Sequence, residues 1–279
     1  MSRVAAIQMA SGPNIGANLI EAERLIGMAV ENGAELLVLP ENFALMGLTE
    51  EDKVEACEDE GSGPIQGFLS RQAATHGVWI VGGTVPLRSP QAGKVYAACL
   101  VYDPSGAVVA RYDKMHLFDV RIEASQENYT ESLTIVPGER VTVVDTPFGR
   151  LGLAVCYDLR FPELFRCMLE QDVELFAIPS AFTAFTGKAH WEALVRVRAI
   201  ENLCYVVAAA QGGYHINGRE TYGDSMVVDP WGNVLDRLAN GAGVVCASLD
   251  LEHLRGIRRG FPAISHRRLH CCDEAAKRL

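Results

Sequence analysis

Short runs rich in valine, isoleucine and leucine recur along the whole chain, separated by more polar segments. Such runs are typical of strands that are buried on both faces, because no position in them has to face water. The runs that we expect to form strands cover residues 4–9, 34–40, 78–86, 97–104, 152–157, 174–180, 204–210, 225–230 and 243–251.

Several segments between these runs carry apolar residues at helical spacing, which predicts helices over 18–33, 64–77 and 190–203. Gly33 and Gly77 stand where the first two helices should end, and glycine is favoured at that position. Strands that alternate with helices in this way indicate a layered α/β architecture.

Two hairpins are predicted by the Asp-Pro-x-Gly sequences at 103–106 and 229–232, because each lies between two apolar runs. A purely parallel, doubly wound sheet contains no such hairpin, so we expect mixed sheets covered by helices. No proline-rich or serine-rich linker and no block of charge divides the chain, which indicates a single domain.

The composition excludes several classes of protein. The formal net charge is −10 and no basic stripe is present, so we expect no nucleic-acid partner. No apolar stretch approaches about 18 residues and no signal-peptide pattern opens the chain, so we expect a cytoplasmic protein with no membrane contact. The eight cysteines include no Cys-x-x-Cys pair, which favours reduced thiols and no metal site; Cys271 and Cys272 lie in a polar tail.

Three polar residues stand where apolar runs end: Glu41, Lys114 and Cys156. Pro162 suits the first turn of a helix just after Cys156, and the positive end of such a helix stabilises a thiolate. Taken singly, such a cysteine is usually a packing residue, such a glutamate a helix cap and such a lysine a solvated one. Together they supply the nucleophile, base and cation that a thiol needs to hydrolyse an amide without a metal.

The segments LPENF at 39–43, YDKMHLFD at 112–119 and CYDLRFPEL at 156–164 resemble the three signature motifs of the nitrilase superfamily of carbon-nitrogen hydrolases, in the same order. This resemblance implies a four-layer αββα sandwich with mixed sheets. It covers a carbon-nitrogen hydrolase domain at 1–268 and leaves only a polar C-terminal tail at 269–279. It also implies a homodimer, in which two sandwiches join into a longer one, and we expect no cofactor.

By the same resemblance Cys156 is the nucleophile, Glu41 the general base and Lys114 the group that stabilises the tetrahedral intermediate. The family carries a second glutamate after the lysine motif. The matching residue here is Glu131, which is implied to lie near the lysine and help position the substrate, with Glu127 as the alternative.

The segments at 179–213, 222–232 and 261–268 are similar to one branch of the superfamily, whose members act as deaminated glutathione amidases. That substrate is an amide of 2-oxoglutarate with cysteinylglycine. It therefore presents carboxylates, which an arginine can bind with two parallel hydrogen bonds. We expect a small-molecule amide substrate with carboxylates as the principal partner.

The pattern of that branch makes Arg160 the anchor of the 2-oxo acid and places Phe182 and Thr186 in the substrate pocket, while the backbone N–H of Tyr157 helps to bind the oxyanion. The alternative for Arg160 is a structural ion pair with a carboxylate such as that of Glu163. His190 is interpreted as a structural residue at a helix start, because the catalytic residues leave it no task.

Several functions remain open at this point. The leading one is a thiol amidase that releases 2-oxoglutarate and cysteinylglycine. The same catalytic residues serve an ω-amidase acting on 2-oxoglutaramate, a hydrolase of another small aliphatic amide or N-carbamoyl compound, or a nitrilase. The alternative from another class is a non-catalytic binding or scaffold protein that has kept the fold.

Overall fold

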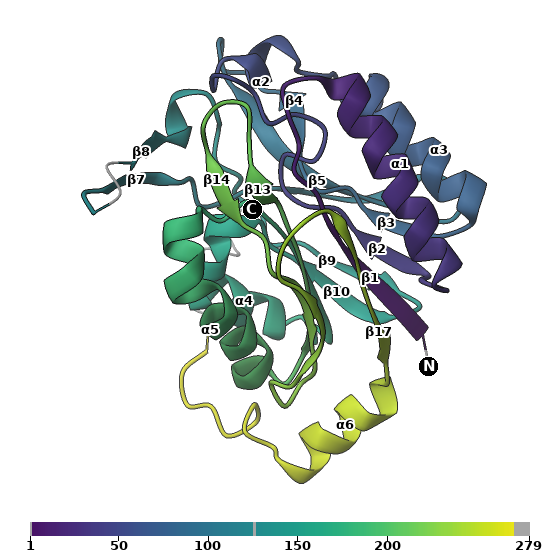
Figure 1. Cartoon of the computed structure of the whole chain (residues 1–279). Helices are drawn as coiled ribbons and strands as arrows, with labels where there is room; N and C mark the ends of the chain where they lie inside the picture. Colours follow the sequence, from purple (N-terminus) through teal and green to yellow (C-terminus); the bar gives the residue numbers. More distant parts are fainter. Residues whose placement is uncertain (1, 125–126, 271–279) are drawn as a thin grey trace.

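Two large mixed sheets stack face to face, and helices cover the outer face of each (Figure 1). The structure is a computed structural model that describes residues 2–124 and 127–270. Cys271, Cys272 and all but the first two residues of the expected tail lie outside the described residues. The arrangement is the αββα sandwich expected from the sequence.

The first sheet has the strand order β17-β1-β2-β3-β5-β4, with β6 paired to β5. Strands β1, β2 and β3 run parallel to one another, and the other pairings are antiparallel. The strands of this sheet are β1 (Ser2–Gln8), β2 (Leu36–Val38), β3 (Trp79–Val81), β4 (Val85–Arg88), β5 (Val95–Tyr102), β6 (Val108–Asp113) and β17 (Gly243–Leu249).

The second sheet has the strand order β16-β15-β12-β11-β10-β9. Its central strands β10, β11 and β12 are parallel, and its outer strands pair antiparallel. The strands of this sheet are β9 (Val143–Thr146), β10 (Gly149–Leu153), β11 (Leu175–Ser180), β12 (Tyr205–Ala210), β15 (Ser225–Val228) and β16 (Val234–Leu238).

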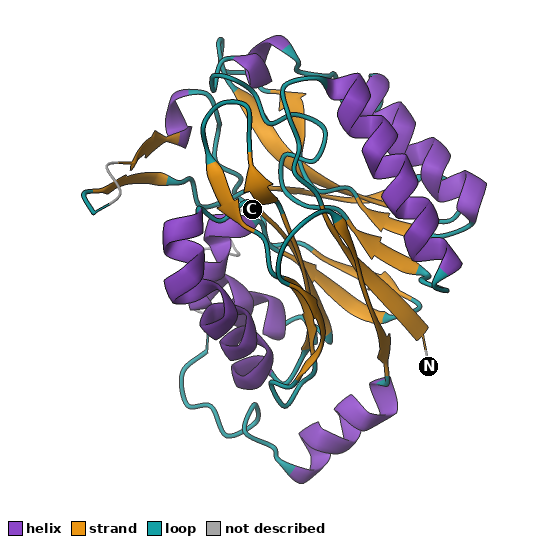
Figure 2. Cartoon of the chain, viewed as in Figure 1, coloured by secondary structure: helices purple, strands orange, loops and turns teal. Residues whose placement is uncertain are grey.

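The helices form the two outer layers (Figure 2). Helices α1 (Ile15–Glu31) and α3 (Pro64–His76) pack on the first sheet, and α4 (Pro162–Leu169) and α5 (Ala184–Asn202) pack on the second. The remaining helices are α2 (Asp52–Glu55), α6 (Leu251–Gly260) and two 3₁₀ turns, η1 (Glu131–Leu133) and η2 (Cys156–Arg160). No helix among the described residues is long and apolar enough to span a membrane.

Strand β1 shows why the apolar runs carry no polar face. Val4 and Ala6 belong to the core shared with the second sheet, whereas Ala5 and Ile7 belong to the core beneath α1 and α3. All four side chains have an exposed fraction of 0%. Successive strand residues point to opposite faces, so a strand between two layers must be apolar at every position.

The two predicted hairpins are present, and an aspartate organises each turn. Asp103 follows β5, and its Oδ1 accepts hydrogen bonds from the backbone N–H groups of Ser105 and Ala107. Asp229 follows β15, and its Oδ1 accepts from those of Trp231 and Asn233. Aspartate favours such turns because its carboxylate satisfies N–H groups that have no strand partner.

Two smaller hairpins were not expected from the sequence. The helix predicted at 190–203 is also longer in the structure than the sequence suggested. The hairpins are β7 (Asp119–Ile122) with β8 (Glu127–Thr130), and β13 (Gly212–Tyr214) with β14 (Glu220–Tyr222). Helix α5 begins at Ala184, because Oγ1 of Thr183 accepts a hydrogen bond from the N–H of Thr186 and caps the helix.

Candidate active site

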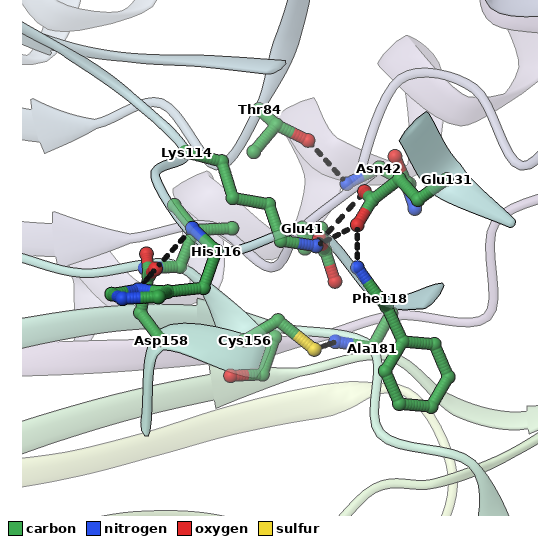
Figure 3. A network of polar contacts seen from close by, with 12 residues as sticks. Glu41, Asn42, Thr84, Lys114, His116, Phe118, Glu131, Cys156, Asp158 and Ala181 are labelled. Carbon is green, nitrogen blue, oxygen red and sulfur yellow. Dashed lines mark hydrogen bonds and ion pairs between the residues drawn. The ribbon is translucent and has the colours of Figure 1, made fainter. Parts of the chain in front are cut away.

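Cys156 lies at a sharp turn that follows strand β10. It opens η2 with a left-handed backbone conformation, φ +49°, which a non-glycine residue adopts at a cost. Its side chain is buried, and its Sγ accepts a hydrogen bond of 3.4 Å from the backbone N–H of Ala181, just after β11 (Figure 3). The thiol is therefore held in a defined place by backbone from two neighbouring strands.

Asp158 fixes this turn, and sequence reasoning gave it no role. Its Oδ2 accepts hydrogen bonds from the backbone N–H of Val155 at 2.8 Å and from the hydroxyl of Tyr112 at 2.7 Å. Its Oδ1 accepts from the N–H of His116 at 3.0 Å and lies 2.7 Å from Nδ1 of that ring. The fully buried carboxylate thus ties the turn that carries Cys156 to the segment that carries Lys114.

Lys114 is buried between two carboxylates. Its Nζ donates to Oε1 of Glu41 at 2.8 Å and to both carboxylate oxygens of Glu131, at 2.8 and 2.9 Å (Figure 3). Glu131 also accepts the backbone N–H of Phe118 at 2.7 Å. Only 2% of the Lys114 side chain and 5% of the Glu41 side chain are exposed. Buried charges persist when paired in this way.

The pKa values of Lys114 and Glu131 follow from their burial and from these contacts. Burial alone disfavours the charged ammonium, but the charges of Glu131 and Glu41 raise the pKa of Lys114 well above its usual value. Burial likewise opposes ionisation of Glu131, yet the charges of Lys114 and Lys53 and the hydrogen bonds hold its pKa below its usual value. Lys114 is therefore an ammonium and Glu131 a carboxylate at neutral pH.

The state of the thiol corrects an expectation from the sequence. Burial and the charge of Glu41 raise the pKa of Cys156 well above the usual value, although Lys114 and the N–H of Ala181 act in the opposite direction. The helix start after Cys156 does not by itself produce a thiolate. A neutral thiol acts as a nucleophile only when a nearby base takes its proton, and the charge of Glu41 acts on this thiol.

Glu41 reaches the site from the other sheet. It follows β2, and its backbone carbonyl accepts a hydrogen bond of 3.1 Å from Nε2 of Gln211. The next residue, Asn42, has a left-handed conformation with φ +57°, and its N–H donates to Oγ1 of Thr84 at 2.8 Å. Glu41 and Lys114 thus come from the first sheet, while Cys156 and Ala181 come from the second.

The pocket above this group has an empty volume of about 630 Å³, part of it open to solvent. It brings together all the site residues that the sequence suggested, whereas the alternative residue Glu127 lies outside its lining and accepts a hydrogen bond from the Tyr129 hydroxyl. The suggested residues in the lining are Glu41, Lys114, Glu131, Cys156, Tyr157, Arg160, Phe182 and Thr186.

Comparison with known proteins identifies the family of this chain. The profile of the carbon-nitrogen hydrolase family matches residues 3–259. The chain belongs to the carbon-nitrogen hydrolase family. Among curated relatives, a deaminated glutathione amidase of Synechocystis is 42% identical, over 94% of this chain and 97% of that protein. The human protein of the same name is 41% identical, over 95% of this chain and 82% of that protein.

Solved structures of the nitrilase superfamily share the fold of this carbon-nitrogen hydrolase. Nit3 of Saccharomyces cerevisiae, a member of branch 10 of that superfamily, superposes with a TM-score of 0.86 at 31% identity, over 96% of this chain and 97% of that one. The NitFhit protein of Caenorhabditis elegans gives a TM-score of 0.87 at 38% identity. That match covers 96% of this chain but only 65% of the longer NitFhit chain.

In this carbon-nitrogen hydrolase Arg160 faces the pocket from the end of η2. Its guanidinium lies 5.8 Å from the ring centre of Tyr157 and 5.1 Å from that of Phe182. Within the described part of the chain Arg160 forms no ion pair with Glu163, the alternative that the sequence left open. A cation that lines a pocket without an acidic partner is available to an anionic ligand.

His190 was wrongly expected at a helix start. It lies within α5, exposed at the surface, and its Nδ1 is 3.1 Å from Nη1 of Arg160. The helix begins earlier because Thr183 caps it, so His190 lies within the helix, next to Arg160, and not at the helix start.

Further residues of the pocket were missed by sequence reasoning. Lys53, Tyr129 and Arg219 line it from α2, β8 and the loop between β13 and β14. These segments are polar and carry no motif, so no local signal marked them. No group of three or more histidine, cysteine, aspartate or glutamate side chains in residues 2–124 and 127–270 is arranged to hold a metal ion.

Proposed function

We propose that the chain is an amidase that hydrolyses deaminated glutathione to 2-oxoglutarate and cysteinylglycine. The observation that carries the proposal is the grouping of Cys156, Glu41 and Lys114 in one pocket that also contains Arg160, a cation with no acidic partner among the described residues. The names of the curated relatives support this choice of substrate.

Acylation begins with proton transfer from Cys156 to Glu41, the carboxylate whose charge acts on the thiol. Sγ then attacks the amide carbonyl, and Lys114 together with the backbone N–H of Tyr157 stabilises the negative oxygen. Glu41 returns the proton to the leaving nitrogen as the C–N bond breaks. The amine departs and a thioester of Cys156 remains.

Deacylation uses the same groups in reverse. Glu41 takes a proton from water, the hydroxide oxygen attacks the thioester carbonyl, and Lys114 again stabilises the oxyanion. The C–S bond breaks as the carboxylic acid forms, and the proton held by Glu41 returns to the sulfur of Cys156. Glu131 keeps Lys114 in place through both steps, because both of its carboxylate oxygens bind the ammonium.

The acyl group of the substrate carries a 2-oxo acid, and we assign its carboxylate to Arg160. The planar guanidinium presents two parallel donors to a carboxylate, and the rings of Tyr157 and Phe182 fix its position. Thr186, whose Oγ1 lies 2.8 Å from that of Thr183, forms the adjoining wall.

The test is the release of 2-oxoglutarate from deaminated glutathione and, separately, from 2-oxoglutaramate. We expect a higher kcat/KM for deaminated glutathione, with turnover of both abolished in Cys156→Ala and retained in Cys246→Ala, a matched change at a half-buried thiol on β17. A preference for 2-oxoglutaramate would assign the chain to the ω-amidases. Undiminished turnover by Cys156→Ala would overturn the thiol mechanism itself.

We also propose a homodimer and a cytoplasmic location. An exposed apolar patch supports the dimer: Val197, Ile200, Trp231 and Phe261 are each 44–55% exposed, and the rings of Trp231 and Phe261 pack edge to face. A patch of this kind is typical of an interface between copies. Sedimentation velocity of the wild type and of Ile200→Asp tests the dimer, which the charged residue should dissociate.

A further inference from the structure

Arg219 is a second arginine that lines the pocket. Within residues 2–124 and 127–270, Arg219 forms no ion pair, and its Nε is buried without a hydrogen-bond partner. Its Nη2 donates to the backbone carbonyl of Ala181 at 2.5 Å, and its guanidinium lies over the ring of Tyr129, 5.2 Å from the centre. The Arg219 side chain is therefore held in place, while most N–H groups of its guanidinium are free to bind an anion.

The loop that carries Arg219 is anchored to the body of the protein. His215 bonds through Nδ1 to the carbonyl of Ser11 at 2.8 Å and through Nε2 to Thr221 at 2.7 Å. Asn217 donates to the carbonyl of Gly47 at 2.7 Å. A charged group on a loop fixed at several points is suited to bind a ligand in one orientation.

Arg219 stands where the catalytic pocket opens into an outer groove. It lines both, as do Lys53 and Tyr129, whereas Cys156 and Arg160 line the pocket alone. Lys53 is already paired with Glu50 at 2.7 Å. Of Lys53, Arg160 and Arg219, Arg219 is thus the one that lines both cavities and has no acidic partner among the described residues.

We propose that Arg219 binds a carboxylate at the far end of the leaving group and so selects amides whose amine part is itself an acid. The inference rests on the proposed function, in which Arg160 binds the carboxylate of the 2-oxo acid. Two cations that line one pocket, each without an acidic partner among the described residues, match a substrate with one carboxylate on each side of the scissile bond. A simple ω-amide, which releases ammonia, has nothing to place against Arg219.

The experiment compares deaminated glutathione with the same compound carrying a carboxamide in place of the glycine carboxylate. For the wild type we expect kcat/KM to favour the acid by roughly 10- to 100-fold, the contribution of one charge-assisted contact. In Arg219→Met this ratio should fall towards one. Arg121→Met, at an exposed arginine on β7 outside the pocket, is the matched control and should keep the wild-type ratio.

The ratio separates binding from a structural role. If Arg219→Met slows both compounds equally and the ratio persists, Arg219 merely supports the site through Ala181 and the inference is wrong. A wild-type ratio near one overturns it as well, while leaving the proposed substrate intact. Failure of the wild type to hydrolyse either compound refutes the proposed function instead, before any variant is examined.

Discussion

Lys114 and Glu41 form a buried ion pair of 2.8 Å at the base of the pocket. Both groups come from the first sheet, and each has a separate task in the proposed reaction, one as the cation for the oxyanion and the other as the base. Removing Lys114 would leave two buried carboxylates without a cation, and removing Glu41 would leave the ammonium paired with Glu131 alone. Variants that keep size and hydrogen bonding are therefore more informative than truncations.

Glu41→Gln should abolish hydrolysis and at the same time lower the pKa of the Cys156 thiol. The amide cannot take a proton, so we expect kcat to fall roughly 100- to 10,000-fold. Burial still raises the thiol pKa, but the charge of Glu41 no longer adds to it and Lys114 still lowers it. Thiolate absorbance against pH, with Cys156→Ala subtracted, measures this change. An unchanged or higher pKa would contradict the assigned electrostatics.

Glu131→Gln should weaken the fold in a pH-dependent way. The pKa of Glu131 is lowered in the folded state from its usual value of 4.5, so its contribution to stability is complete above about 4.5 and is lost as the pH falls through the folded-state pKa. We expect the variant to lose about 3 kcal/mol at neutral pH, because Lys114 loses a buried partner. Urea denaturation across the acidic range should show the two proteins converging as the pH falls below 4.5. A constant difference would argue against this role.

Asp158→Asn should disturb the position of Cys156. Oδ1 of Asp158 accepts the backbone N–H of His116, and Oδ2 accepts that of Val155. In either orientation of an asparagine amide, the NH₂ group would therefore face one of these N–H groups. We expect a loss of about 2 kcal/mol in stability and a slower reaction of the folded enzyme. The rate constant for alkylation of Cys156 and the kcat of hydrolysis should both decrease.

The matched control for this prediction is Asp229→Asn, in the turn between β15 and β16. Asp229 also binds backbone N–H groups, but it lies outside the pocket lining. The Asp229→Asn variant should have a lower free energy of unfolding but an unchanged kcat of the folded protein. If Asp158→Asn behaves in the same way, Asp158 is a structural residue only.

Arg160→Met should raise KM for amides of 2-oxo acids, with kcat/KM falling roughly 10- to 100-fold. Arg160→Lys should restore only part of the loss, because an ammonium cannot present two parallel donors. Steady-state kinetics with 2-oxoglutaramate check both variants, and Arg121→Met on β7 serves as the control. An unchanged KM in Arg160→Met would remove Arg160 from substrate binding.

The sequence predicts the large elements of this fold well, because strands that are buried on both faces have little choice of residue. Val4 to Ile7 alternate between two cores and are all apolar, so the run marks the strand without ambiguity. The small hairpins β7–β8 and β13–β14 lie outside the sandwich, where polar residues are tolerated and the apolar pattern disappears. Their residues at the pocket could not be found for the same reason.

For the candidate site, too, some features could be predicted from the sequence and others could not. Glu41, Lys114 and Cys156 follow strands, and the ends of those strands converge on one pocket, as the motifs suggested. The protonation state of the thiol was not predictable, because it depends on burial and on the distance to Glu41, which belongs to the other sheet. Asp158 escaped notice because its contacts with Tyr112 and His116 join residues 42 to 46 positions apart in the sequence.

The division of the site between two sheets makes catalysis a reporter of tertiary assembly. Each sheet keeps its own backbone hydrogen bonds if the two slide or separate slightly, but the base and the cation on one then lose their alignment with the sulfur on the other. Attack on a carbonyl tolerates little misplacement. Under mild denaturing stress, turnover should therefore disappear while the secondary structure is still intact.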